Sequence, residues 1–175
     1  MKTKLSVLVS DFDDTLFFIN DCIRAASLEV IGKEFNLYEV KNMDRDLRGK
    51  IYDTAHSKYW HKAIANVPVI DYVKKLQSEG YETIILSARG EEHRQIMAGM
   101  LSSVGLQYKK MILAPDHSTS DEKWKLSEFN KLLDQYPRLI ALEDKKENIE
   151  YILDRVDRKR LEFYHVDRGD IRKVE

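Results

Sequence analysis

The chain has 175 residues, which is enough for one domain with a sizeable hydrophobic core and leaves room for a small insertion. Hydrophobic residues make up 43% of it and charged residues 34%, a mixture typical of folded proteins that excludes an intrinsically disordered chain. Because 29 basic residues nearly balance 30 acidic ones, the formal net charge is -1. There is thus no global field to attract nucleic acid, although a local basic patch remains open.

The cysteine count and the hydropathy pattern favour a cytoplasmic location. Cys22 is the only cysteine, so no internal disulfide can form, which indicates a reducing compartment. The apolar run after Lys2 and Lys4 is too short for the core of a signal peptide, and Asp11 interrupts it. No stretch is long enough to cross a bilayer, so we expect no membrane partner.

The first predicted element is a short strand that leads into an acidic loop. Residues 5–9 form an apolar, β-branched run of the kind that is buried on both faces of a sheet. The sequence Ser-Asp-Phe-Asp-Asp-Thr-Leu follows at 10–16. Three carboxylates so close together need a cation, a proton or a phosphate network, and in an open parallel sheet ligands bind at the carboxyl ends of strands. The loop therefore predicts a functional site, with an ordinary acidic turn as the alternative.

A long segment from Phe17 to Val67 precedes the next predicted strand. Residues 20–35 carry apolar side chains at helical spacing, with Asn20 as the expected N-cap. Residues 44–65 show a second helical pattern. We therefore expect a helical hairpin, inserted between the first strand and the rest of the sheet.

The remainder of the chain alternates between helical and strand-like patterns. Gly80 and Gly105 mark the ends of two of the helices. This alternation, with short loops, predicts a parallel sheet with helices on both faces. From Asp167 onward the residues are charged, and we expect a mobile tail. Strands are expected at 83–86, 111–114, 139–142 and 161–166, and helices at 68–80, 96–104, 124–133 and 149–156.

Polar residues recur where the predicted strands end. Asp11 and Asp13 follow the first strand, and Ser87 follows the second. Glu143 and Asp144 follow the strand at 139–142, and Lys123 or Lys125 lies in the preceding loop or helix. This set resembles the haloacid dehalogenase-like (HAD) superfamily of phosphatases. Asp-Phe-Asp-Asp-Thr-Leu at 11–16 is similar to the first motif of that superfamily, Leu-Ser-Ala-Arg-Gly at 86–90 to its Thr/Ser motif, and Glu143-Asp144 to its acidic fourth motif.

The resemblance implies a three-layer α/β/α Rossmann-like core with a small helical cap inserted after the first strand. The core would comprise residues 1–16 and 68–175, and the cap residues 17–67. In this superfamily a cap in that position closes over the site and selects the substrate, which favours small molecules. Within the cap, Tyr59, Trp60, Arg48, Lys50 and Lys58 either line this lid or pack the hairpin and face water.

The resemblance also implies a role for each motif residue. Asp11 would be the nucleophile that forms an aspartyl-phosphate, because an acyl phosphate is labile. Asp13 would protonate the leaving oxygen and then activate water. Magnesium would be held by Asp11, by the backbone carbonyl of Asp13 and by Asp144. Ser87 would bind a phosphate oxygen, and the lysine would neutralise the nucleophile and the phosphate.

Several assignments have alternatives. Lys125 is favoured over Lys123, because Trp124-Lys125 begins the amphipathic pattern of the following helix. Arg89 would contact phosphate or substrate, or else form a surface ion pair. Thr15 is expected to bond the loop backbone around Asp11 and to belong to the substrate-binding residues. Asn148 stands where the superfamily often has a second acid, and Glu143 is open to interpretation as a simple strand-end acid.

The predicted function is that of a magnesium-dependent phosphomonoesterase acting on a small phosphorylated metabolite or nucleotide. A nucleic-acid 3′ end is an alternative substrate. A module that accepts or binds phosphate for signalling, without hydrolysis, is the alternative function. Zinc is not expected from the sequence, because none of the five histidines shows a paired metal-ligand spacing; these are His56, His61, His93, His117 and His165.

Overall fold

The computed structural model describes residues 6–115 and 120–175 and is built around a six-stranded sheet. The strand order is β5-β4-β1-β6-β7-β8. The first five strands in this order are parallel, and β8 is antiparallel to β7. The strands are β1 (Val7–Ser10), β4 (Glu82–Gly90), β5 (Lys110–Ala114), β6 (Leu139–Glu143), β7 (Leu161–Asp167) and β8 (Asp170–Lys173).

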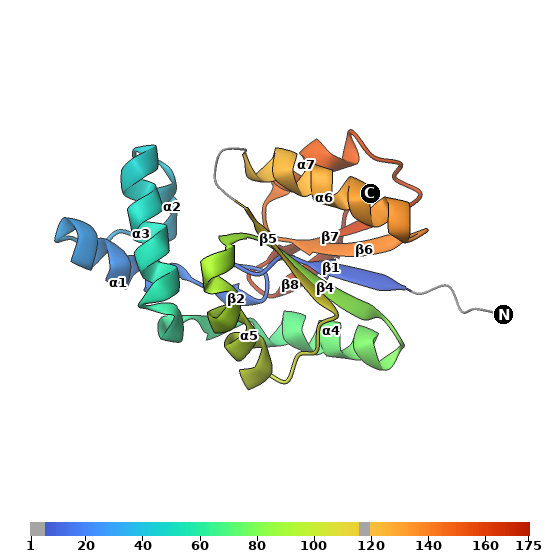
Figure 1. The fold of residues 1–175 in the computed structure, drawn as a ribbon, viewed down its shortest axis with the longest axis horizontal. Helices are drawn as coiled ribbons and strands as arrows, with labels where there is room; N and C mark the ends of the chain where they lie inside the picture. The colour runs from blue at the N-terminus through green and yellow to red at the C-terminus, as the bar shows by residue number, and fades with distance from the viewer. Residues whose placement is uncertain (1–5, 116–119) are drawn as a thin grey trace.

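Two layers of helices cover the sheet, as Figure 1 shows. On β1, Leu8 packs on the side of α4 and α5, whereas Val7 and Val9 pack on the side of α6 and α7. Successive side chains of a strand point to opposite faces, so this uninterrupted apolar run is buried on both. The expected α/β/α fold is confirmed. The helices are α4 (Val67–Ser78), α5 (Arg94–Ser103), α6 (Asp121–Gln135) and α7 (Lys146–Leu153).

Three more helices, α1 (Asn20–Ile31), α2 (Leu37–Lys41) and α3 (Arg45–Ser57), lie beyond the end of the sheet (Figure 1). They enclose a hydrophobic cluster of their own, which includes the fully buried Ile23 and Ile51. We call α1 to α3 the cap helices. None of the helices in residues 6–115 and 120–175 is both long enough and apolar enough to span a bilayer.

The cap helices join the core through a short antiparallel pair of strands. β2 (Phe17–Phe18) pairs with β3 (Ile64–Ala65), and Phe17 lies opposite Ala65. Beyond β3, the backbone amide of Asn66 donates to the carbonyl of Leu16 at 2.9 Å. The two ends of the insertion therefore leave and return at one place.

The cap differs in detail from the sequence prediction. Asn20 is not the N-cap of α1; Ile19 has that position, and Asn20 Oδ1 accepts from the amide of Leu37 at 3.0 Å. α3 ends at Ser57 rather than at residue 65, and a short 3-10 helix, η1 (Trp60–Lys62), and β3 follow it. The predicted helix at 44–65 extends beyond the end of α3, because the spacing of apolar residues contains no information about the pairing of β3 with β2.

The expected mobile tail is wrong. Asp170 pairs with Asp167, so β8 folds back onto β7 through a two-residue turn. The two turn residues, Arg168 and Gly169, have φ of 49° and 96°. Positive φ at both positions is what a tight hairpin turn requires. The sequence does not signal this turn, because arginine is an uncommon residue in the left-handed region.

Candidate active site

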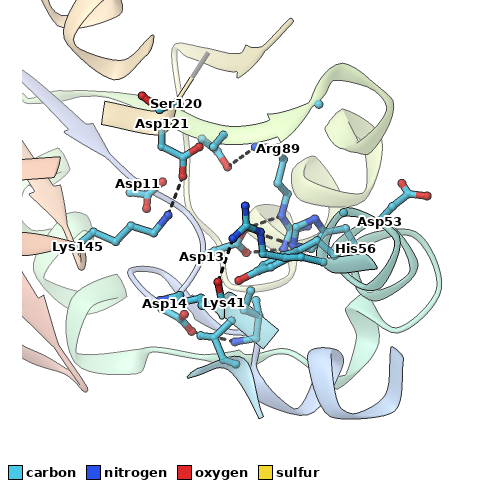
Figure 2. Close-up of a pocket in the computed structure, with 18 of the residues that line it drawn as sticks. Asp11, Asp13, Asp14, Lys41, Asp53, His56, Arg89, Ser120, Asp121 and Lys145 are labelled. Atoms are coloured by element: carbon cyan, nitrogen blue, oxygen red, sulfur yellow. Dashed lines mark hydrogen bonds and ion pairs between the residues drawn. The ribbon is translucent and has the colours of Figure 1, made fainter. Parts of the chain in front are cut away.

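The acidic loop begins where β1 ends, between two neighbouring strands. Ser10 is in register with Ile85 of β4 and Leu142 of β6, and the Asp11 amide donates to the Leu142 carbonyl at 3.0 Å. The loop then turns tightly, with Asp14 at a φ of 56°. This turn directs the Asp11 and Asp13 side chains out of the sheet (Figure 2).

A cavity of about 1270 Å³ lies between the cap helices and the carboxyl ends of the strands. Residues of α2 and α3 form one wall, and residues following β1, β4 and β6 form another. The structure thus brings most of the predicted site residues to one place. Those that line the cavity are Asp11, Asp13, Ser87, Arg89, Lys125, Asp144 and Asn148.

Lys125 lies at the site, whereas Lys123 is exposed and does not line the cavity. The Lys125 side chain is buried, with Nζ 3.0 Å from Asp11 Oδ1. Nζ also donates to Glu143 Oε2 at 2.6 Å. Burial lowers the pKa of Lys125, but the negative charges of Asp11 and Glu143 outweigh it, so the pKa lies above its ordinary value. Lys125 is therefore a fixed positive charge beside Asp11.

Glu143 holds this lysine and is not a simple strand-end acid. Its side chain is buried, and Asn148 Nδ2 donates to Oε1 at 3.2 Å. Lys125 thus donates to one oxygen of this carboxylate and Asn148 to the other. Asn148 therefore supports the lysine through Glu143, a role that the sequence left open.

Asp11 and Asp144 converge as the resemblance requires. One carboxylate oxygen each of Asp11, Glu143 and Asp144 lie within 4.8 Å of one another. Burial raises the pKa of Asp11 to about 7, with Lys125 opposing this rise, and it raises the pKa of Asp144 well above its ordinary value. Asp144 Oδ1 is buried and has no hydrogen-bond partner among the described residues. A buried, unpartnered carboxylate oxygen beside a second carboxylate fits a hard cation such as Mg²⁺.

Asp13 forms a two-pronged ion pair with Arg89. Arg89 Nε lies 3.0 Å from Asp13 Oδ2 and Nη2 lies 2.6 Å from Oδ1, as Figure 2 shows. The guanidinium stacks over the Phe12 ring, and His56 Nε2 of the cap is 3.5 Å from Asp13 Oδ2. Burial would raise the pKa of Asp13, but Arg89 and then His56 outweigh it and lower the pKa to about 2. Arg89 is buried, so it does not form a surface ion pair; it holds Asp13 ionised, and its contact with phosphate or substrate stays a prediction.

Ser87 and Thr15 have different surroundings. Ser87 lines the cavity, and its Oγ accepts from the amide of Arg89 at 3.3 Å. Thr15 is fully buried and does not line the cavity. Among the described residues, nothing bonds its hydroxyl, and only its carbonyl is held, by Asn66 Nδ2 at 2.8 Å. The expected contact of Thr15 with substrate and the expected bond from its hydroxyl are therefore wrong.

The cavity also contains groups that the sequence did not indicate. Lys145 donates to Asp121 Oδ2 at 2.8 Å (Figure 2). Burial lowers the pKa of Lys145, but Asp121 outweighs it and the pKa is raised. The position of Lys145, directly after Glu143-Asp144, was an available signal. Among the expected lid residues, Arg48 and Lys50 line the cavity. Lys58, Tyr59 and Trp60 do not, and Lys58 pairs with Glu29 instead.

The chain was compared with known proteins. No protein-family model matches it, and no curated protein matches it. Solved structures match it along most of its length. A haloacid dehalogenase-like hydrolase from Bacteroides fragilis is 15% identical, with a TM-score of 0.65, and the match covers 95% of this chain and 89% of that one. A predicted phosphoglycolate phosphatase from Haemophilus somnus is 13% identical, with a TM-score of 0.58 and coverage of 88% and 83%.

A chain in the structure of a Pnkp1/Rnl/Hen1 complex is also similar. It is 18% identical, with a TM-score of 0.64, over 97% of this chain but 48% of that chain. The present chain therefore corresponds to about half of that larger protein. At these identities, the three matches show a shared fold.

Proposed function

We propose that this chain, which has the fold of the HAD-like hydrolases, is a magnesium-dependent phosphomonoesterase that acts through an aspartyl-phosphate on Asp11. The observation that carries the proposal is the meeting of Asp11, Lys125 and Asp144, which are far apart in sequence. A nucleophile, a fixed positive charge and a candidate metal ligand within one cavity are what phosphoryl transfer needs.

In the first step, an Asp11 oxygen bonds to phosphorus as the bond to the leaving oxygen breaks. Lys125 offsets the charge on Asp11, and Ser87 donates to a phosphate oxygen. Asp13 supplies the proton to the leaving oxygen. In the second step, water attacks the phosphorus, Asp13 takes a proton from that water, and Asp11 is released.

The ion pair with Arg89 must open before Asp13 can donate a proton, because a carboxyl with a pKa of about 2 is ionised near neutral pH. A phosphate group in the cavity competes with Asp13 for the guanidinium. Once Arg89 has turned to the phosphate, Asp13 loses the charge that lowers its pKa most, so the pKa rises. Substrate binding would thus prepare the acid.

Mg²⁺ fits the donor set. The carboxylates of Asp11 and Asp144 and the backbone carbonyl of Asp13 would hold it, since all three are hard oxygen ligands. When bound, the ion neutralises charge on the phosphate and holds it in position. Glu143 lies next to these ligands, and its hydrogen bonds with Lys125 and Asn148 give it a supporting position beside the ion.

The cap wall favours a small phosphorylated substrate that fits within the cavity. A phosphorylated nucleic-acid 3′ end is a second candidate, supported by two observations. One structural neighbour belongs to a Pnkp1/Rnl/Hen1 RNA repair complex. Four basic residues of the cap also line the cavity: Lys41, Arg45, Arg48 and Lys50.

A screen of phosphate release tests the proposal. Sugar phosphates, nucleotides and 3′-phosphorylated oligonucleotides would be offered with and without Mg²⁺, to the parent and to Asp11→Asn. We expect repeated turnover that requires the metal and that Asp11→Asn abolishes. Asp14→Asn is the matched control, because Asp14 accepts from the Ile19 amide at 3.3 Å and asparagine keeps that acceptor.

Two outcomes would contradict the proposal. Equal activity of Asp11→Asn and the parent would remove Asp11 as nucleophile. A single phosphorylation of Asp11 without further release of phosphate would instead favour the signalling function.

A further inference from the structure

A second group of metal-binding side chains lies at the rim of the cavity, between the cap and the core. Asp53 belongs to α3 of the cap, whereas Glu92 and His93 belong to a short 3-10 helix, η2 (Glu91–His93), that follows β4. All three line the cavity, and one ligand atom from each lies within 4.8 Å of the others. Figure 2 shows Asp53 next to His56, on the far side of the cavity from Asp11 and Lys145.

The distances in this group match those between ligands of one ion. His93 Nε2 lies 3.3 Å from Glu92 Oε1 and 3.6 Å from Asp53 Oδ1. In a tetrahedral zinc site with bonds of about 2.1 Å, neighbouring ligand atoms are about 3.4 Å apart. Both N···O distances are longer than that of an ordinary N–H···O hydrogen bond.

The histidine is the informative member of the group. Its side chain is 5% exposed, whereas those of Asp53 and Glu92 are 68% and 63% exposed. The ring makes no hydrogen bond to another described residue, and its Nε2 is directed at the two carboxylates. A buried imidazole between two acids, unlike an acidic cluster alone, is a donor set with a nitrogen ligand, which selects zinc-like ions over magnesium.

The backbone next to this group leaves room for the Glu92 carboxylate. A Cβ at Gly90 would lie 2.3 Å from Glu92 Oε1, so a larger residue there would displace the carboxylate. Gly90 also ends β4, which fixes η2 directly behind the strand that carries Ser87. The strand therefore places the backbone of Glu92 at the rim of the cavity, whereas its exposed side chain can still change rotamer.

We propose that Asp53, Glu92 and His93 form a binding site for a divalent ion of the zinc class, which links the cap to the core. Three protein ligands would leave a fourth position open for water or another ligand. The site shares no residue with the Asp11–Asp144 site, so the two sites take different ions by ligand chemistry. The sequence argued against zinc because it showed no paired histidines; here one histidine meets two acids, one of which is about 40 residues away.

Co²⁺ is a suitable probe, because it takes zinc sites and absorbs visible light strongly when four-coordinate. The full chain, saturated with Mg²⁺ to fill the oxygen-ligand site, would be titrated with Co²⁺. We expect one equivalent of Co²⁺ to bind with an intense visible band. Asp53→Asn should weaken this binding at least about 100-fold, since even the outer partners of metal ligands are worth about 10- to 100-fold.

Two matched variants locate the site. Asp46→Asn removes another exposed cap acid that lines the same cavity, and it should keep the band. Asp144→Asn disables the other site and should also keep it. The proposal would be overturned if the parent showed no band or if Asp53→Asn kept it. Loss of the band in Asp144→Asn would also overturn it. The test reads metal binding alone, so it is independent of phosphatase activity.

Thermal unfolding gives a second measurement. Zn²⁺ should raise the Tm of the parent, because an ion that binds only the folded state stabilises it. The same concentration should leave the Tm of Asp53→Asn unchanged. Asp53 is used in preference to the buried His93 because it is exposed, so Asp53→Asn is expected to fold even if His93→Gln does not. Circular dichroism checks that it does. An equal rise in Tm for the parent and Asp53→Asn would show adventitious binding and refute the site.

Discussion

At the residue scale, Lys125 carries the sharpest prediction. Its amine is buried between Asp11 and Glu143, so Lys125→Met leaves two buried carboxylates without their cation. We expect phosphatase activity to fall by at least about 100-fold, as for the loss of one preorganised donor. The free energy of unfolding should fall by about 3–5 kcal/mol, the usual cost of breaking a buried pair. Steady-state kinetics and urea unfolding measure the two effects.

The control for this prediction is the neighbouring lysine. Lys123 is exposed, so Lys123→Met should change the free energy of unfolding by less than about 0.5 kcal/mol and leave activity unchanged. Similar losses in the two variants would contradict the assignment of Lys125. The sequence favoured Lys125 because Trp124-Lys125 opens an amphipathic pattern, and burial of the same helix face explains why that pattern was informative.

Arg89 shows where residue-level prediction stops. The Ser-Ala-Arg-Gly sequence placed it near phosphate, but its partner is Asp13, 76 residues earlier. Motif spacing indicates which side chains reach a cavity, whereas the pairing among them depends on the tertiary geometry. The same limit applies to Thr15, whose hydroxyl is enclosed by the loop that it was expected to hold.

At the element scale, β8 is held by side chains as well as by its pairing with β7. Glu162 of β7 accepts from Tyr164 Oη at 2.6 Å, and it lies 3.1 Å from Lys173 Nζ of β8 and 2.6 Å from Arg138 Nη2. These groups, the Tyr164 hydroxyl first, lower the pKa of Glu162. A carboxylate with a lowered folded-state pKa stabilises the fold above its unfolded pKa and loses this contribution as the pH falls.

A pH series on Glu162→Gln tests this arrangement. At pH 6 the variant should have a lower free energy of unfolding than the parent, because the charged contacts are present only in the parent. The difference should shrink as the pH falls through about 4 and below, where Glu162 is protonated. Urea unfolding at pH 6 and pH 3 measures it. A difference that stays constant with pH would show that the charge of Glu162 does not stabilise β8.

The elements that the sequence predicted well are those with long local patterns. The strands at 83–86, 111–114 and 139–142 lie within β4, β5 and β6, because each is a short apolar run whose side chains are mostly buried. By contrast, β2 and β3 have two residues each and exist only through their pairing. No local periodicity can arise from so short an element.

At the scale of the whole molecule, the cap helices and the sheet have separate hydrophobic clusters. Ile51 is fully buried in the cap cluster, so Ile51→Ala should cost about 2–5 kcal/mol in that cluster. We expect faster amide hydrogen exchange in α1 and α3, with β1 and β6 unchanged. Hydrogen-exchange mass spectrometry checks this. The comparison variant is Ile85→Ala, which truncates a buried side chain in the sheet cluster. If each variant increased exchange equally in the cap helices and in the sheet, the two would form one cooperative unit.

The part of the site that could be predicted from the sequence is the part that the order and direction of the strands determine. Parallel strands end at one edge, so Asp11, Ser87 and Asp144 meet there, whatever the loops do. The cap wall was not predictable in the same way, because its contribution depends on which side of α3 faces the cavity. Asp53 and His56 reach the core from that helix, and neither had a signal in the sequence pattern.

The pairing of Phe17 in β2 with Ala65 in β3 affects how a protein of this fold can diversify. Since everything between these two positions departs from and rejoins a single anchor point, its length and composition can vary without shifting β1 or Asp11, which follows it. The wall of the cavity that the cap supplies can then change while the wall at the strand ends is retained.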